Sequence, residues 1–279
     1  MKYYLFPKFF LNCTTEELMA YTAELGFDGP TALVREGYAL TPENLREALP
    51  AYLAAARREG LTVAYANTPF DMAHIEDFED GIRCLKEYGI TQFRLNHVPK
   101  NVAPARELAP RLREMAQRTE ALMQKIGGIQ AIIQIHGYCY PHNATAAYAA
   151  VQGLDPACIG VKLDPGNNIC QEGYELFSYQ IDLLGEYIAA VSGKDVSITR
   201  TGDPQAADKG WRRAFVPADE GIIDYVPIFR QLKEQGFHGP LIMMPFYHEN
   251  DLARHLDGLR RDMRYFKACE QAARGGEAR

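Results

Sequence analysis

Short β-type runs of apolar residues alternate with longer amphipathic segments along the chain. The runs lie at 2–6, 29–34, 61–66, 92–98, 130–136, 159–164, 187–193 and 240–246. Helical periodicity follows most of them, after 14 and at 42–58, 74–88, 103–126, 144–152, 174–186, 224–235 and 250–273. This alternation predicts an α/β fold whose strands form a parallel sheet.

Cap residues mark where several of these helices begin and end. Thr14-Thr15-Glu16-Glu17 is a capping box, and Thr41-Pro42 supplies an N-cap with proline in the first turn. Glycine-containing segments at 25–29 and 235–239 lie where a helix should end and the next strand begin. Eight strand–helix units in roughly 250 residues are typical of a (β/α)8 TIM barrel. With no Ser/Gly-rich linker and no block of charge, we expect a single domain over 1–279.

Composition excludes several classes of protein. The net charge of −6 argues against a nucleic-acid platform, which is usually basic. No window approaches the roughly 18 apolar residues of a membrane span, and the first eight residues do not resemble a signal peptide. The six cysteines form no CxxC pair, so we expect reduced thiols in a cytoplasmic protein.

The stretch Ile159–Asn167 carries the clearest candidate chemistry. An apolar run delivers the Asp164 carboxylate at its end, and the following Pro-Gly pair predicts a turn there. Lys162 lies two positions earlier, so the period of a strand points it the same way as Asp164. Charged groups at the carboxyl ends of parallel strands are where α/β barrels place their active sites.

Other predicted strands end in the same way. Polar pairs in one register occur at four neighbouring strand ends: Arg94 with Asn96, Gln134 with His136, Lys162 with Asp164, and Ser192 with Lys194. Polar side chains at matching depth are costly to bury unless they pair or bind something. The pattern therefore predicts a small-molecule site at the carboxyl mouth of the barrel.

Motifs over essentially the whole length carry a family resemblance. They are Leu25–Gly29, His136-Gly137, Leu163–Asn167, Lys194-Asp195-Val196, Asp219–Tyr225 and Gly236–Leu241. In order and spacing the chain resembles the xylose isomerase-like TIM-barrel superfamily, which includes the sugar phosphate isomerases and epimerases. The resemblance implies a carbohydrate-like substrate at the barrel mouth and action as an isomerase, an epimerase or a lyase.

That family typically holds one divalent metal with Glu, Asp, His and Glu on strands five to eight. The matching positions here are Gln134, Asp164, Ser192 and Met244, so only Asp164 of the expected ligands is present. Gln134 and Ser192 are poor ligands, and a thioether is too soft for a hard cation. We therefore expect no metal and no other cofactor.

Lysine is the expected replacement for the metal. Lys162 and Lys194, with Arg94, would place positive charge beside Asp164 and favour a carboxylate, phosphate or enolate-like group. We predict a catalytic set of Lys162, Asp164 and His136, with His136 or a desolvated Lys162 as acid/base. The expected substrate-binding residues are Arg94, Asn96, Gln134, Lys194 and Arg213.

Structural roles remain open for each of these groups. Asp164 and Lys162 also fit a structural ion pair, His136 a hydrogen-bonded core histidine, and Arg213 a solvated surface residue. His97 is expected to face the helices or a loop.

Two functional classes stay open as well. One is an enzyme acting on an acidic or phosphorylated sugar-like molecule without a metal. The other is a non-catalytic sugar-binding or partner subunit, which the loss of three ligands favours. A nuclease is disfavoured by the acidic charge. The sequence leaves open whether the chain forms a homo-oligomer.

Overall fold

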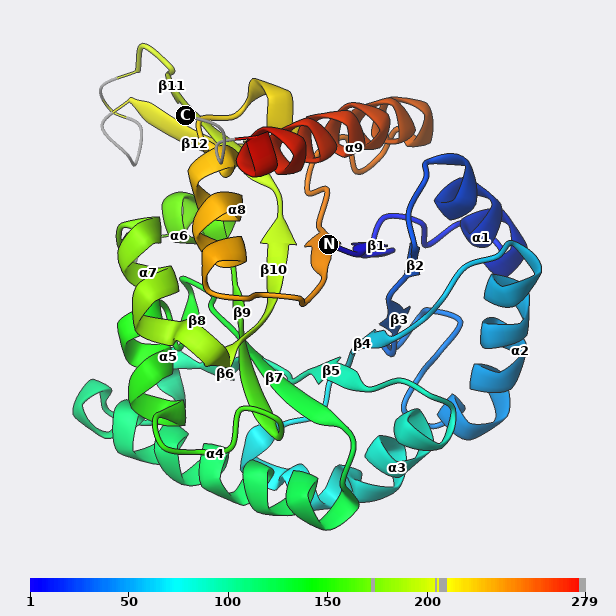
Figure 1. The fold of residues 1–279 in the computed structure, drawn as a ribbon, viewed down its shortest axis with the longest axis vertical. Helices are drawn as coiled ribbons and strands as arrows, with labels where there is room; N and C mark the ends of the chain where they lie inside the picture. Colours follow the sequence, from blue (N-terminus) through cyan, green and yellow to red (C-terminus); the bar gives the residue numbers. More distant parts are fainter. Residues whose placement is uncertain (172–173, 204, 206–209, 276–279) are drawn as a thin grey trace.

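Parallel strands close into a barrel at the centre of the molecule (Figure 1). The computed structural model describes residues 1–171, 174–203, 205 and 210–275. In the barrel the strand order is β2-β1-β13-β10-β9-β7-β5-β4-β3, and every pair in it is parallel. The strands are β1 (Tyr3–Leu5), β2 (Gly29–Pro30), β3 (Ala32–Leu33), β4 (Tyr65–Asn67), β5 (Gln92–Arg94), β7 (Gln130–Gln134), β9 (Ile159–Leu163), β10 (Ile188–Gly193) and β13 (Leu241–Met243).

The barrel closes through one strand that is split in two. β2 pairs with β1 and β3 pairs with β4, and only Thr31 separates the two segments. The Thr31 amide donates to the Leu5 carbonyl at 2.8 Å, and the Val34 amide donates to the Asn67 carbonyl at 2.9 Å. β2 and β3 therefore act as one strand position, and the predicted eight-stranded barrel is confirmed.

Helices form a ring around these strands (Figure 1). They are α1 (Thr15–Glu24), α2 (Leu45–Arg58), α3 (Glu79–Glu87), α4 (Ala105–Ile126), α5 (Ala144–Val151), α6 (Pro165–Cys170), α7 (Phe177–Leu184), α8 (Tyr225–Glu234) and α9 (Leu252–Arg274), with short 3₁₀ turns at Met72–Phe78, Lys100–Val102, Gly185–Tyr187 and Ala218–Glu220. The predicted capping box is present: Thr14 and Glu17 each accept a backbone hydrogen bond from the other. Gly26 follows α1 with φ of 77°, the left-handed conformation that favours glycine at a helix end.

Apolar side chains fill two regions. The larger cluster joins the outer face of the strands to the helices, and a smaller cluster packs inside the barrel. The inner cluster consists of Tyr4, Phe6, Leu33, Tyr65, Ile132, Ala189, Ala190, Ile242 and Met244. The barrel interior is therefore a packed core, and a ligand has access only at its end.

Three local predictions need correction. The Pro165-Gly166 turn is instead the start of α6, because Asp164 caps that helix and proline suits its first position. The predicted strand 92–98 ends at Arg94, and Val98–Pro99 (β6) pairs with Cys139–Tyr140 (β8) outside the barrel. Between the predicted strands 187–193 and 240–246, where the sequence pattern gives no strand, Asp195–Arg200 (β11) and Trp211–Val216 (β12) form an antiparallel pair.

Among the residues that the structure describes, no helix combines the length and the apolar character needed to cross a membrane.

Candidate functional site

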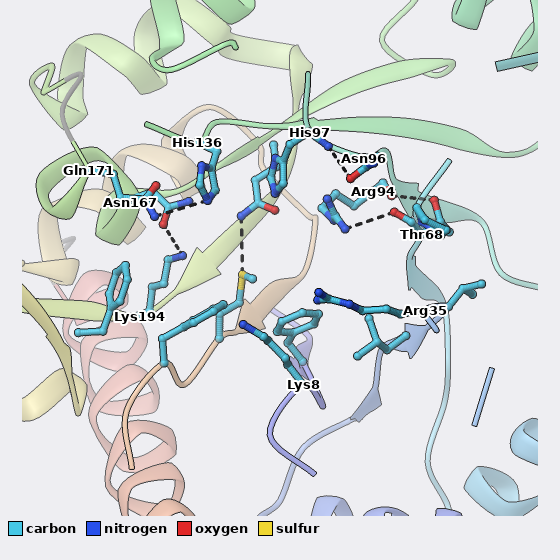
Figure 2. A pocket seen from close by; sticks show the side chains of 18 residues that line it. Lys8, Arg35, Thr68, Arg94, Asn96, His97, His136, Asn167, Gln171 and Lys194 are labelled. Carbon is cyan, nitrogen blue, oxygen red and sulfur yellow. Dashed lines mark hydrogen bonds between the residues drawn. The ribbon is translucent and has the colours of Figure 1, made fainter. Parts of the chain in front are cut away.

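A cavity of about 360 Å³ opens at the carboxyl end of the barrel strands (Figure 2). Each of its walls is built from residues at or just after the end of a strand, which matches the predicted position of the site. The polar lining consists of Lys8, Arg35, Thr68, Arg94, Asn96, His97, Gln134, His136, Asn167, Gln171 and Lys194. Phe6, Phe215, Met244 and Phe246 are among the apolar residues that complete it.

Five of the eight predicted site residues line this cavity: Arg94, Asn96, Gln134, His136 and Lys194. Lys162 and Asp164 do not. Both are completely buried, with 0% of their surface exposed, and lie beneath the lining.

Arg213 lies elsewhere. It is exposed on β12, outside the cavity lining, where its Nη1 donates to the carbonyl of Ile169 at 3.4 Å. In this structure, then, Arg213 does not contribute to the cavity lining.

Asp164 is at the centre of a group of hydrogen bonds that we call the Asp164 cluster. Its Oδ2 accepts from Gln134 Nε2 at 2.7 Å, Ser192 Oγ at 2.8 Å and Asn167 Nδ2 at 3.1 Å, and lies 3.2 Å from Lys194 Nζ. Its Oδ1 accepts from the Asn167 amide at 2.9 Å. Burial opposes ionisation of this carboxyl, but Lys194 and these hydrogen bonds together hold the pKa of Asp164 below its ordinary value.

The four positions that the resemblance aligns with metal ligands do meet in space. Gln134 and Ser192 contact Asp164, and the Met244 sulfur lies 3.3 Å from Ser192 Oγ and 3.9 Å from Gln134 Nε2. The donor set does not fit a hard divalent cation, however. It holds one carboxylate, and that carboxylate is already occupied by hydrogen bonds from the chain's own side chains.

Lys162 lies deep in the barrel, between an aromatic ring and a sulfur. Its Nζ is 3.4 Å from the Met244 sulfur and 5.9 Å from the centroid of the Tyr65 ring. Burial lowers the pKa of Lys162 well below its usual value, and the charge of Asp164 offsets this only in part. Because Met244 covers it, Lys162 has no direct access to a ligand in the cavity.

Lys194 is held in place from several sides. Its Nζ donates to Asn167 Oδ1 at 2.7 Å and pairs with Asp164, and it lies 5.0 Å from the ring centroids of Phe215 and Phe246. Burial lowers the pKa of Lys194, while the charge of Asp164 and the hydrogen bond to it act in the opposite direction. An ammonium has three hydrogens, so one remains available to a ligand.

Gly166 permits this placement of Lys194. A Cβ atom at position 166 would lie 2.6 Å from Lys194 Cγ, closer than two carbon atoms can approach. A glycine in the first turn of α6 is therefore needed for the lysine to pack across that helix.

Three further cations line the cavity without an acidic partner. Within the described residues, no carboxylate forms an ion pair with Lys8, Arg35 or Arg94. Arg94 donates instead to the carbonyls of Leu95 at 2.8 Å and Thr68 at 3.3 Å. Burial lowers the pKa of Arg94 to about 10, so it stays charged at neutral pH. No Asp or Glu of the described chain is part of the lining, so the cavity is strongly cationic.

His97 corrects an expectation, because it lines the cavity and does not face the helices. Strand β5 ends at Arg94, so the alternation on which the expectation depended stops before residue 97. The rings of His97 and His136 are in contact, with centroids 4.5 Å apart. Burial lowers the pKa of His97 well below its usual value and that of His136 to about 4, so both are neutral at pH 7.

Gln171 fixes the orientation of His136. Its Oε1 accepts from the Gly137 amide at 3.1 Å, which leaves its Nε2 to donate to His136 Nε2 at 3.4 Å. The proton of the neutral imidazole then lies on Nδ1, which is buried without a hydrogen-bond partner among the described residues. His136 thus presents one unused polar group.

The sequence reasoning missed several lining residues. They are Lys8, Arg35, Thr68, His97, Asn167, Gln171, Phe215 and Phe246. Most of them follow a strand end by only a few residues. Extending the search for polar side chains from the strand ends into the next few residues would have found Lys8, Arg35 and Thr68.

Comparison with known proteins agrees with this geometry. The chain belongs to the xylose isomerase-like TIM barrel family, whose model matches residues 19–269. A search of curated proteins finds no match to the sequence.

Several solved structures share the fold. The IolI protein, solved with a bound zinc atom, has a TM-score of 0.73 and 16% identity, over 97% of this chain and 98% of that one. The 3-keto-D-glucoside 4-epimerase YcjR of E. coli has a TM-score of 0.69 and 14% identity, over 96% and 100%. The probable 3-DHS dehydratase AsbF of Bacillus anthracis has a TM-score of 0.69 and 15% identity, over 96% and 99%. At these identities the likeness establishes the fold alone.

Proposed function

We propose that the cavity binds an acidic carbohydrate-type small molecule, and that it does so without the divalent metal of the family. One observation carries the proposal: Lys8, Arg35, Arg94 and Lys194 line a single cavity that has no carboxylate in its described lining. Cations gathered around one cavity repel one another, and an anionic ligand relieves that repulsion. A carboxylate or phosphate also accepts charge-assisted hydrogen bonds from such groups.

The remaining lining suits a polyol. Asn96, Gln134 and Thr68 supply neutral donors and acceptors for hydroxyl groups, and Phe246 offers an apolar surface. The Asp164 cluster lies below and acts by holding Gln134 and Lys194 in position. We therefore assign Asp164 a positioning role and assign contact with the ligand to the lining residues.

The proposed chemistry is proton transfer next to a carbonyl group of the ligand. His136 is the one member of the predicted catalytic set in the lining, and its neutral imidazole takes the proton at Nε2 when the ligand displaces the hydrogen bond from Gln171. The negative charge that develops on the carbonyl oxygen would lie among the cations, with Lys194 the best positioned to stabilise it. Return of the proton to the same carbon gives epimerisation. Its return to the neighbouring carbonyl carbon, with transfer of the adjacent hydroxyl proton to the carbonyl oxygen, gives isomerisation.

A second candidate is a binding protein without catalysis. The Asp164 cluster favours this candidate. At the four positions where relatives are expected to hold their catalytic metal, the side chains of this chain contact each other through hydrogen bonds. Lys162, buried under Met244, adds no reactive group to the cavity.

Two measurements test these proposals. Calorimetry should detect binding of gluconate and no binding of glucitol, which has the same carbon chain and no charge. Equal binding of both contradicts the electrostatic proposal, as does the failure of every acidic carbohydrate tested to bind.

Catalysis is tested separately by proton exchange. A panel of aldonic and uronic acids is incubated with the protein in deuterated water. NMR should show that the acid that serves as substrate loses the signal of one carbon-bound proton. His136→Gln should abolish the exchange and leave binding in place. Ligands that bind to the wild-type protein without any exchange would favour the non-catalytic candidate.

A further inference from the structure

We infer that the ligand carries two anionic groups, one held between Lys194 and Lys8 and the other between Arg35 and Arg94. This inference rests on the proposed function and specifies its ligand as a sugar diacid or a phosphorylated sugar acid. It follows from how the cations are distributed around the cavity, and from how many hydrogen-bond donors each of them has left.

Lys8 and Lys194, the first pair, both contact the ring of Phe246. Lys8 Nζ lies 4.8 Å and Lys194 Nζ 5.0 Å from the centroid of Phe246, so both ammonium groups border one side of the cavity. Lys8 follows β1 and Lys194 follows β10, and only β13 separates these strands in the barrel.

The second pair lies across the cavity. Arg35 follows β3 and Arg94 ends β5, again with one strand, β4, between them. Both side chains line the cavity, and Figure 2 shows Arg35 and Arg94 on the same side of it. Figure 2 shows Lys194 on one side of the cavity and Arg94 on the other, with the neutral His97 and His136 along the wall between them.

Each pair has unused donors. Arg94 uses two of its five N–H groups on backbone carbonyls, and the Arg35 and Lys8 side chains form no hydrogen bond with the part of the chain that the structure describes. Lys194 keeps one N–H after binding Asn167 and Asp164. Asp164 compensates Lys194, and the charge of Glu249 acts on Lys8. Within the described residues Arg35 and Arg94 remain as two lining charges without an ion-pair partner, which is more than one carboxylate neutralises.

Calorimetry with a matched series of ligands tests the inference. Glucitol, gluconate and glucarate share a six-carbon polyol chain and carry no, one and two carboxylates. Phosphogluconate places a phosphate in the second position. We expect glucarate, phosphogluconate or both to bind at least about tenfold more tightly than gluconate, since a charge-assisted hydrogen bond is worth about that much. The tighter of the two identifies the second group as carboxylate or phosphate.

Single substitutions then locate the two groups. Arg35→Met and Lys8→Met change cavity residues outside the Asp164 cluster, and each should remove most of the gain of the dianion over gluconate. Arg57→Met is the matched control, because Arg57 is exposed near the end of α2, where the chain leads into the opposite end of the barrel. It removes the same charge and should leave the gain unchanged.

The outcomes separate the inference from the proposed function. Gluconate binding with no gain for either dianion overturns the inference alone. A gain that persists in Arg35→Met, or that is lost equally in Arg57→Met, also overturns it, because the second group would then not lie at Arg35. Failure of all three anions to bind overturns the proposed function itself.

Discussion

Replacing Asp164 with Asn perturbs the site at its most connected point. The carboxylate is fully buried, receives four hydrogen bonds and pairs with Lys194 at 3.2 Å. An asparagine removes the charge. It must also turn its NH₂ group either toward the donors of Gln134 and Ser192 or toward the amide of Asn167. Either orientation places two donors against each other and leaves the Lys194 ammonium without its counter-ion.

The size of the effect follows from burial. Breaking a buried ion pair from one side costs about 3–5 kcal/mol, because the remaining charge is left uncompensated. For a chain of this length that corresponds to a drop in melting temperature of about 6–10 °C. Ser192→Ala is the control, since it removes one neutral donor to Asp164 and should cost about 1 kcal/mol.

Urea unfolding followed by circular dichroism measures both variants. We expect the Asp164→Asn midpoint to fall well below that of Ser192→Ala, with the same dependence on urea. If Asp164→Asn loses no more than Ser192→Ala, the Asp164 cluster does not stabilise the barrel as described, and Lys194 is not held by it.

Three further predictions concern the interior. Lys162→Met should stabilise the protein to urea, by an amount that grows as pH falls from about 10, because burial lowers the pKa of Lys162 and its protonation favours the unfolded chain. Burial raises the pKa of Asp262, hydrogen-bonded to Tyr247, to about 7, so the contribution of Asp262 to stability should fall as pH rises from about 4 to 7. Asp262→Asn should flatten that part of the urea profile; an unchanged slope contradicts the assignment. Gly166→Ala should displace Lys194 and weaken gluconate binding, measured by calorimetry, about tenfold or more. An unchanged affinity for gluconate would show that Lys194 does not contact the ligand.

The barrel was predictable because its strands and helices have different apolar periods. The same two-residue period placed Arg94 and Gln134 at the mouth, since alternation and strand direction say which side chains of β5 and β7 point inward. Asn96, His136 and Lys194 were predicted by extending that period, and they line the cavity although each lies one or two residues past the end of its strand.

Depth and loop geometry were not predictable in that way. Lys162 and Asp164 point inward as expected, but Met244 covers Lys162, and Ser192 and the other partners of Asp164 cover the carboxylate. This packing involves strands distant in sequence. His97 lies beyond the end of β5, where alternation no longer applies. Lys8 and Arg35 follow β1 and β3 in segments without a repeating pattern, so only the folded chain brings them together with Arg94.

The central claim is that fixed cations replace the metal in binding an acidic ligand. The most direct test is the melting temperature of chelator-treated protein with gluconate or glucitol, before and after adding back Mg²⁺, Mn²⁺ or Zn²⁺. Bound ligand raises the melting temperature by mass action. We predict that gluconate stabilises the metal-free protein, that glucitol does not, and that added metal changes neither result. Stabilisation by gluconate only after a metal is restored would contradict the account.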